Sequence, residues 1–541
     1  MCNNHLHLKG TPNSGINDSH HDVEHQAWSR RSFIQALGLS GVGSMMLGNT
    51  SILASGPSPL AAAINQSEND NILVILRLKG GNDGLNTIIP RNQYSTYANL
   101  RPSIRINEGE LFNLSDEYAM PLFMNSLASL WGDGKMKVVH GVGYEDGSLS
   151  HFQGSDNWAT TDHPNTGITS GWMGRYFQEI YPDFLFTPPE RPAAIQIGNN
   201  GNLIFDGDDA NYAFAVANPQ QLFEIAQNGI LYSLENPSPC TYGDQSTFLR
   251  GVANTTLTYA GTINSAYENS VDTGNYTDGN LSEQLSIVSR LIKGGLGTKV
   301  YMVSLGGFDT HNNQPDRHQS LLTEIADSMK AFYDDLQTVG MDDKVLTMTI
   351  SEFGRRVAQN GSNGTDHGAA SPLFLFGSGL NGSGFEGVHP DLNDLDNRGN
   401  LKPSVDFRQI YASVMTDWLC IDPTLVNNAL LGQDYNPLSL GLNCSGILST
   451  GDDINGFSFK HAFAYDNRTP LITYETDKGA RIVIKIYNII GQEISTVQNE
   501  FVSQGSHKVD ISTVANELPT GQYIYRISTA GRNYSKSFVL Q

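Results

Sequence analysis

Short apolar runs separated by glycine-rich loops dominate the middle of the chain. Four such runs lie at residues 71–78, 299–305, 344–350 and 372–376. Between the second and the third, apolar side chains recur at helical spacing over residues 316–339. Continuous apolar runs are typical of strands buried on both faces, and the order strand, loop, helix, strand is typical of a parallel sheet. We therefore predict an α/β domain with a central sheet flanked by helices.

The pattern changes near residue 457. Residues 481–487 place isoleucine at every second position, and two further alternating runs follow Pro519 and the turn at residues 530–533. A period of two predicts half-buried strands, and regular turn signals between short strands predict a small antiparallel β-sandwich. From this pattern alone, the module would be a carbohydrate-binding or adhesive one.

The N-terminal residues have the order of an export signal. A polar stretch precedes Arg30 and Arg31, which are followed directly by a weakly apolar segment that ends in small residues near position 63. This order resembles a twin-arginine signal, and the alternative is an amphipathic helix that carries an arginine pair. We predict a leader over residues 1–63, an α/β domain over 64–440, a linker over 441–461 and a β-sandwich over 462–541. Residues 210–284 are polar and show no strong periodicity, so we expect loops there.

Charge excludes one class of partner. The 33 basic and 55 acidic residues give a net charge of −22, whereas nucleic-acid binding needs a basic surface. The sequence has no apolar run long enough for a membrane-spanning helix. The four cysteines lack metal-ligand spacing, but two of Cys240, Cys420 and Cys444 can pair in an oxidising compartment, and the sequence leaves the pair open.

Polar side chains gather in the loops that follow the predicted strands. They are Asp83, then Asp309 and His311, then Glu352, Arg355 and Arg356, then Asp366 and His367, with His389 further along the chain. Parallel strands bring their carboxyl ends to one edge of a sheet, where ligands bind. Aspartate and histidine together suit divalent ions such as zinc, manganese or calcium. The candidate metal ligands are Asp83, Asp309, His311, Asp366, His367 and His389.

Each of these residues also has a plain structural explanation. Asp83 can form a turn and Asp309 can cap a helix, because aspartate side chains bond nearby backbone N–H groups. Arg355 and Arg356 can be solvated, and His389 alone is a weak signal. The set carries more weight than its members, because nearly all of them follow predicted strands.

Ser150 is the candidate nucleophile. A glycine-rich loop delivers it to the start of a predicted helix, where backbone N–H groups and the helix dipole favour an alkoxide. Ser148 is the alternative nucleophile, and a plain helix-capping role for Ser150 is the alternative function. No G-x-S-x-G pattern surrounds Ser150, so an esterase elbow is not predicted.

Several motifs in this part of the chain resemble one bacterial family. GGNDGLNT, SHF, GGFDTHNNQ, SEFGRR, GTDHG and DFRQIYASVM, together with HP, resemble the family called domain of unknown function 1501, over roughly residues 70–440. That family looks like a branch of the alkaline phosphatase superfamily, which includes sulfatases. The resemblance implies an alkaline-phosphatase-like sheet, a nucleophile at Ser150 and metal ligands at the six positions named above. Asp309 and His311 are two residues apart, whereas the superfamily usually spaces this pair by four.

The C-terminal segment resembles a second family. IKIYNIIGQEI, LPTGQYIYRI and SKSFVL resemble the C-terminal sorting domain of type IX secretion in Bacteroidetes. With the twin-arginine signal, this resemblance implies passage to the periplasm and then to the cell surface or the medium. The expected partners are therefore the two secretion machineries.

Together these features lead to one functional hypothesis and one alternative. The hypothesis is a metal-dependent hydrolase of phosphate or sulfate esters, on a small molecule or a glycan, in which Ser150 attacks and Arg355 or Arg356 binds the free ester oxygens. The alternative is a non-catalytic exported binding protein for a glycan or a protein, which the shortened Asp309–His311 spacing favours.

Overall fold

The computed structural model describes residues 70–540. Within this range the gaps are 164–165, 185–187, 199–200, 209, 228, 230–231, 233–240, 443, 445–458, 467–468, 477–478, 489–492, 517, 520 and 530–531. The described residues form two compact units, residues 70–419 with 423–443 and residues 420–422 with 444–540. The predicted leader, Cys240 and most of the predicted linker lie outside the described residues.

The first unit is built on a nine-stranded sheet. Its strands, in spatial order, are β13 (Gly384–Glu386), β5 (Met136–Gly143), β12 (Ser371–Phe376), β9 (Val345–Ser351), β1 (Ile72–Lys79), β8 (Val300–Gly306), β6 (Ala194–Ile197) and β7 (Ala213–Val216), with β14 (Val405–Asp406) beside β5. All neighbouring pairs are parallel except those of β12 with β5 and β9. The predicted α/β sheet is confirmed.

The fourth apolar run, at residues 372–376, forms β12, which runs opposite to its neighbours. β12 runs antiparallel to β9 because no helix in residues 352–370 carries the chain back across the sheet. Instead, this connection stays at the carboxyl edge and forms a small ladder of β10 (Gly354–Arg355) with β11 (His367–Gly368). β12 therefore starts at that edge and runs away from it.

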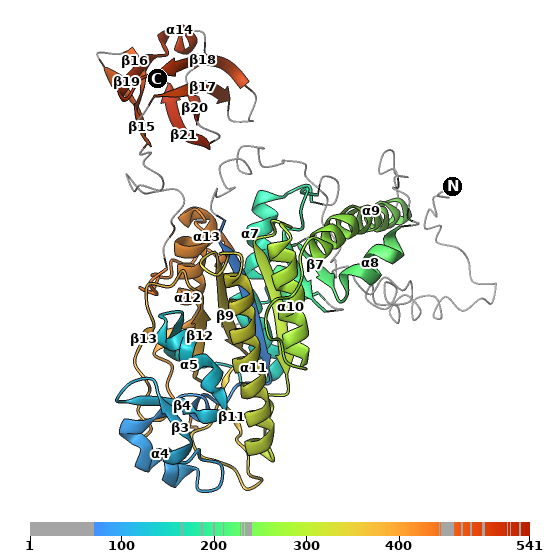
Figure 1. Ribbon diagram of the computed structural model, residues 1–541, viewed down its shortest axis with the longest axis vertical. Coiled ribbons are helices and arrows are strands. Elements are labelled where there is room, and N and C mark those ends of the chain that lie inside the picture. The colour runs from blue at the N-terminus through green and yellow to red at the C-terminus, as the bar shows by residue number, and fades with distance from the viewer. Residues whose placement is uncertain are drawn as a thin grey trace, which may run out of the picture. The chain divides into compact units, whose positions relative to one another are not determined.

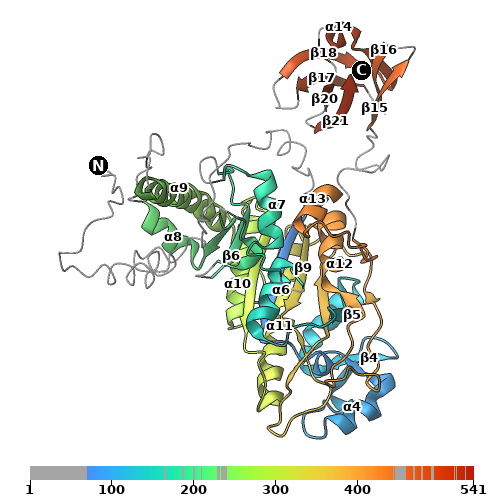
Figure 2. The ribbon, with the colours of Figure 1, turned by 180° about the vertical axis from the view of Figure 1, so that it is seen from behind.

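Helices cover both faces of this sheet (Figures 1 and 2). On one face, α9 (Thr241–Glu268), α10 (Asn280–Lys293) and α11 (Gln314–Gln337) pack on alternate side chains of β1, including Val74 and Leu76. Over the other face lie α6 (His151–Thr160), α7 (Trp172–Ile180) and α12 (Phe407–Ser413). There Tyr411 stacks on Trp172 with ring centroids 4.3 Å apart and donates a hydrogen bond to the Trp158 carbonyl. The loops expected at residues 210–284 were wrong for much of that stretch, because α9 and α10 occupy it.

The remaining elements of the first unit are short. A three-stranded sheet contains β2 (Ile89–Pro90), β4 (Tyr118–Pro121) and β3 (Leu111–Asn113). The other α-helices are α4 (Tyr94–Leu100), α5 (Ala128–Gly132), α8 (Pro219–Ala226) and α13 (Pro423–Ala429). The short 3-10 helices are η1 (Gly84–Asn86), η2 (Arg91–Gln93), η3 (Glu108–Glu110), η4 (Leu122–Leu127) and η5 (Leu203–Phe205), and η6 (Val414–Trp418) is a π-helix.

The second unit is an antiparallel sandwich, as predicted. One sheet contains β15 (Phe459–Asp466), β16 (Thr469–Thr476) and β19 (Gly505–Asp510), and the other contains β18 (Glu493–Val502), β17 (Ala480–Asn488), β20 (Gly521–Thr529) and β21 (Arg532–Leu540), with the short α14 (Ser512–Ala515) alongside. The alternating isoleucines of β17, such as Ile484, are fully buried and share one core with Ile472 and Tyr474 of the facing sheet. This shared core makes the two sheets a sandwich.

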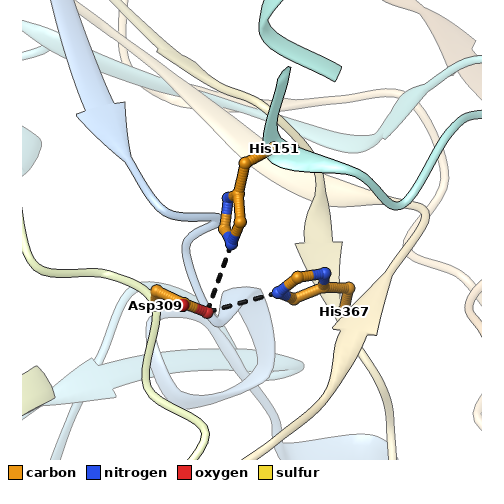
Figure 3. A group of neighbouring side chains, drawn as sticks. All are labelled: His151, Asp309 and His367. Atoms are coloured by element: carbon orange, nitrogen blue, oxygen red, sulfur yellow. Dashed lines mark hydrogen bonds and ion pairs between the residues drawn. The ribbon is translucent and has the colours of Figure 1, made fainter. Parts of the chain in front are cut away.

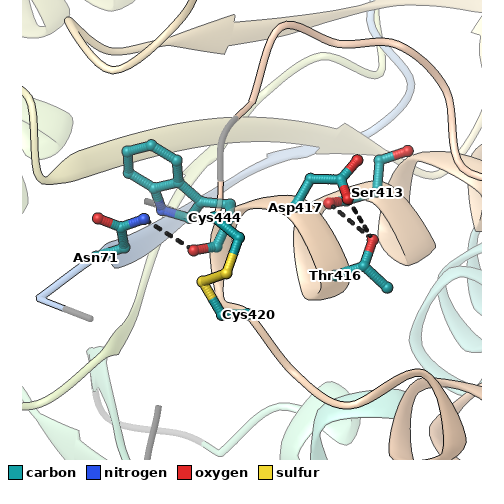
Figure 4. Close-up of a disulfide and its surroundings, with 7 residues drawn as sticks. Asn71, Ser413, Thr416, Asp417, Cys420 and Cys444 are labelled. Atoms are coloured by element: carbon teal, nitrogen blue, oxygen red, sulfur yellow. Dashed lines mark hydrogen bonds between the residues drawn. A yellow bond between two sulfur atoms is a disulfide. The ribbon is translucent and has the colours of Figure 1, made fainter. Parts of the chain in front are cut away.

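Cys420 and Cys444 form a disulfide (Figure 4). Within the first unit, the Asn71 side chain donates a hydrogen bond of 2.9 Å to the Trp418 carbonyl, which attaches the start of β1 to η6. Of the three cysteine pairs that the sequence left open, the structure forms Cys420–Cys444. In the part of the chain that is described, no helix is long and apolar enough to cross a membrane.

Candidate metal centre

The candidate centre lies where parallel strands end. The loops after β1, β5, β8 and β9 meet at the carboxyl edge of the sheet, as expected for parallel strands. Gly80, directly after β1, allows two of these loops to touch. A Cβ atom at Gly80 would lie 2.3 Å from the backbone nitrogen of Asp309, and its φ of +118° is a conformation that glycine adopts without strain.

The carboxylate of Asp309 is the hub of this centre. Its Oδ1 atom lies 3.4 Å from His151 Nε2 and 3.2 Å from the Nε2 atoms of both His311 and His367. Figure 3 shows His151, the first residue of α6, and His367, in β11, pointing at Asp309 from different elements. His311 Nε2 and His367 Nε2 are 2.9 Å apart. Three imidazole nitrogens thus lie around one carboxylate oxygen, and the ligand atoms of His151, Asp309 and His367 all lie within 4.8 Å of one another.

The other ring nitrogen of each imidazole is held by an acceptor. The Nδ1 atoms contact Glu352 Oε2 (2.6 Å from His151), Asp366 Oδ1 (3.1 Å from His311) and the Leu149 carbonyl (2.7 Å from His367). Carboxylates and carbonyls accept hydrogen bonds, so each Nδ1 carries the proton and each Nε2 keeps a lone pair. Histidine ligands of metals are usually held in this way.

This arrangement fits a divalent cation. Lone pairs of three imidazoles that face one carboxylate repel each other unless a positive charge lies among them. His151 Nε2 is buried and has no hydrogen-bond partner among the described residues. Bonds of about 2.0–2.1 Å at tetrahedral angles would place neighbouring ligand atoms about 3.3 Å apart, close to the separations from Asp309. His151, Asp309 and His367 together have the mutual spacing of a metal site.

Two titration shifts suit this role. Burial lowers the pKa of His367, which keeps its imidazole neutral. Burial alone would raise the pKa of Asp309, but the hydrogen bond and the positive charge of Arg355 help to outweigh it, and the pKa falls to about 2. The Asp309 side chain is 46% exposed and that of His311 41%, so the centre can be reached from solvent.

Arg355 belongs to the framework of the centre. Its side chain is fully buried and donates to Asp309 Oδ1 at 2.7 Å. Its other hydrogen bonds go to four backbone carbonyls, those of Gly80, Gly81, Phe308 and Thr365. These contacts give Arg355 a positioning role, and the catalytic role predicted for it stays a prediction.

The structure does not bring two predicted ligands to this cluster. Asp83 is fully buried and forms a bidentate ion pair with Arg101, with N–O distances of 2.6 and 2.9 Å. His389 packs against His140 and Tyr118, with ring centroids 5.1 and 5.5 Å away, and its Nδ1 contacts the Pro390 carbonyl. Both side chains therefore have other roles here.

Ser150 is the N-cap residue of α6, directly before His151. It is exposed, and its hydroxyl makes no capping hydrogen bond, whereas its carbonyl accepts from Gly154 at 2.7 Å. The plain capping role considered for this hydroxyl is therefore not observed. Among the described residues the Ser150 hydroxyl has no hydrogen-bond partner, and Ser150 directly precedes His151 of the candidate centre.

Two residues of the centre escaped the sequence analysis. His151 was read only as part of a helix, and Glu352 was left without a role. The available signal was the place of His151 beside the candidate nucleophile Ser150 in the SHF motif, together with Glu352 directly after the apolar run 344–350. Their pairing across 201 positions is visible only in the fold.

Comparisons with known families confirm both resemblances. Residues 265–435 match the family described as "Protein of unknown function (DUF1501)", and residues 470–541 match the "Secretion system C-terminal sorting domain". The second match marks the protein for export to the cell surface or the medium. No curated protein matches the chain.

Some solved structures show a weak overall likeness. The lipoteichoic acid synthase LtaP from Listeria monocytogenes is 9% identical, with a TM-score of 0.29 and coverage of 89% of this chain and 93% of that one. A protein in the alkaline phosphatase superfamily from Vibrio parahaemolyticus is 10% identical, with a TM-score of 0.28 and coverage of 91% and 93%. The putative sulfatase yidJ from Bacteroides fragilis is 9% identical, with a TM-score of 0.30 and coverage of 87% and 93%. Likeness at this level carries no functional argument.

Proposed function

We propose that this exported protein is a hydrolase of phosphate or sulfate esters that depends on one divalent metal ion. The observation that carries the proposal is the convergence of three imidazole Nε2 atoms on the Asp309 carboxylate, with every Nδ1 held by an acceptor. His151, His311, His367 and Asp309 would hold the ion. We propose a single ion, because Asp83 and His389, two of the six expected ligands, are engaged elsewhere.

The ligand types narrow the choice of metal. Three nitrogens and one carboxylate oxygen suit zinc, with manganese as the second choice. Calcium prefers an all-oxygen shell and is disfavoured. When bound, such an ion would act as a Lewis acid toward an ester oxygen.

The chain supplies the other catalytic groups. Ser150 Oγ gives its proton to water and attacks phosphorus or sulfur. The bond to the ester oxygen breaks, and that oxygen takes up a proton from water and leaves as the alcohol. Water then cleaves the Ser150 ester and releases phosphate or sulfate. We assign the free ester oxygens to Arg356, a half-buried residue whose buried Nε atom has no hydrogen-bond partner among the described residues. The exposed centre accommodates an ester on a small molecule or on a glycan.

Turnover of nitrophenyl phosphate and nitrophenyl sulfate by the full chain tests this function. We expect hydrolysis in zinc that stops with chelator and returns when zinc is restored. Ser150→Ala should abolish turnover and leave metal content unchanged, while Ser148→Ala, two residues away, should retain it. Turnover by Ser150→Ala would contradict the nucleophile. Metal binding without turnover of these or of glycan esters would favour the exported binding protein.

A further inference from the structure

Gln314 lies beneath both loops that carry the candidate ligands. It is the first residue of α11, and its side chain is fully buried. Its Oε1 atom accepts hydrogen bonds from the hydroxyls of Thr310 (3.1 Å) and Thr365 (2.7 Å). Thr310 lies between Asp309 and His311, and Thr365 comes two residues before His367. One amide oxygen thus bridges two segments that are 55 positions apart.

The orientation of this amide is fixed from its other end. Gln314 Nε2 donates to Asp83 Oδ2, which only accepts hydrogen bonds while the carboxyl is ionised. Burial opposes that ionisation, but the Arg101 charge outweighs it and the pKa of Asp83 stays below its ordinary value. Nε2 must therefore face Asp83, which turns Oε1 toward the two threonines.

The backbone strengthens the same bridge. The Thr365 N–H donates to the Thr310 carbonyl at 3.1 Å, and the Gln314 N–H donates to the Asn363 carbonyl at 2.9 Å. The Thr310 and Thr365 side chains are fully buried, so water does not compete for their hydroxyls. The two loops therefore hold a fixed separation.

We infer that Gln314 is a positioning residue that sets the distance between the Asp309–His311 segment and His367. The inference rests on the metal centre proposed above. Asp83, which is paired with Arg101, accepts a hydrogen bond from the Gln314 amide and so fixes the orientation of that amide. In this arrangement Asp83 acts on the centre through Gln314, without contact to the metal.

Binding of Co2+ to the full chain tests this role. Co2+ is chosen because its visible absorption reports the number and geometry of its ligands. Gln314→Met removes the amide that bridges Thr310 and Thr365 and keeps a side chain of similar size. Loss of a residue that supports metal ligands typically lowers metal affinity 10- to 100-fold. We expect a loss of affinity in that range and a changed spectrum. Gln314→Met also removes a partner of Asp83, so a second pair of variants is needed.

Thr365→Val removes one hydroxyl of the bridge, and Thr365→Ser keeps it. We expect Thr365→Val to weaken Co2+ binding several-fold and to alter its spectrum, and Thr365→Ser to restore both. The matched control is Thr349→Val, because the Thr349 hydroxyl bonds the Phe374 backbone inside the sheet, away from the loops. It should lower stability and leave Co2+ binding unchanged.

The possible outcomes separate this inference from the metal centre itself. If the wild type binds Co2+ and both Gln314→Met and Thr365→Val bind it with the same affinity and spectrum, the role of Gln314 is overturned and the metal centre stands. Absence of Co2+ binding by the wild type would overturn the centre, and the inference with it. Equal losses in Thr349→Val and Thr365→Val would show a general effect of destabilisation and would also overturn the role of Gln314.

Discussion

Replacing Asp83 with asparagine should destabilise the first unit strongly. Both carboxylate oxygens face donors only. Oδ1 accepts from Arg101 Nη2, and Oδ2 accepts from Arg101 Nη1 and Gln314 Nε2. Either orientation of an asparagine amide would point its NH2 group at one of these donors, and the buried Arg101 charge would lose its partner.

The magnitude follows from the burial of this pair. Asp83 and Arg101 side chains are both fully buried, and removal of one partner of a buried ion pair costs about 3–5 kcal/mol. The exposed pair of Asp70 and Lys299, with side chains 82% and 41% exposed, provides the control. Asp70→Asn should cost at most about 1 kcal/mol, because water screens exposed ion pairs.

Lowering the pH should reduce the difference in free energy of unfolding between the wild type and Asp83→Asn. The folded pKa of Asp83 lies below its unfolded value, so its charge stabilises the fold above the unfolded pKa of about 4. That contribution is lost as the pH falls through the folded pKa. The gap in stability should therefore be full near neutral pH and shrink in strong acid.

Tryptophan fluorescence during denaturation follows this unit selectively. Of the five tryptophans, four lie in residues 131–418 and none follows residue 418. We expect an earlier unfolding midpoint for Asp83→Asn with an unchanged slope. A loss below about 1 kcal/mol, or a loss of bound metal without a loss of stability, would refute the structural role and restore Asp83 as a ligand.

Three further predictions concern other parts of the molecule. Glu352→Gln should weaken metal binding about 10- to 100-fold, because Glu352 holds His151 Nδ1, and isothermal titration would measure it. Cys420→Ser should lower the free energy of unfolding by about 3 kcal/mol, because it removes the disulfide to Cys444, 24 positions away. Denaturation should show a lower midpoint than for the oxidised wild type. Tyr333→Phe should cost about 1–3 kcal/mol, because the Phe376 carbonyl loses its buried donor at 2.6 Å; an unchanged midpoint would contradict this.

Much of the central sheet was predictable from local pattern. The runs at 71–78, 299–305 and 344–350 match β1, β8 and β9 within one residue at each end, because strands buried on both faces need continuous apolar sequence. The loops at their carboxyl ends supply Asp309 and His311, and the β10–β11 ladder supplies His367, so convergence of these ligands followed from parallel topology.

Other features depend on partners that are distant in sequence. An aspartate after a strand looks the same whether it binds a metal or an arginine, and Arg101, the partner of Asp83, belongs to no motif. His151 enters the centre only because α6 begins at the edge where β5 ends. α9 is missed because its apolar residues follow no strong helical period, although tertiary packing buries Tyr259 and Ile263.

The metal content of the full chain, purified without chelator, tests the central claim most directly. Elemental mass spectrometry should find about one equivalent more zinc or manganese in the wild type than in His367→Ala. Metal bound by histidines elsewhere in the chain is present in both proteins and cancels in this comparison. His507→Ala, in the C-terminal module, should match the wild type. Equal metal content in wild type and His367→Ala, after both are reloaded with zinc, would contradict the proposed centre.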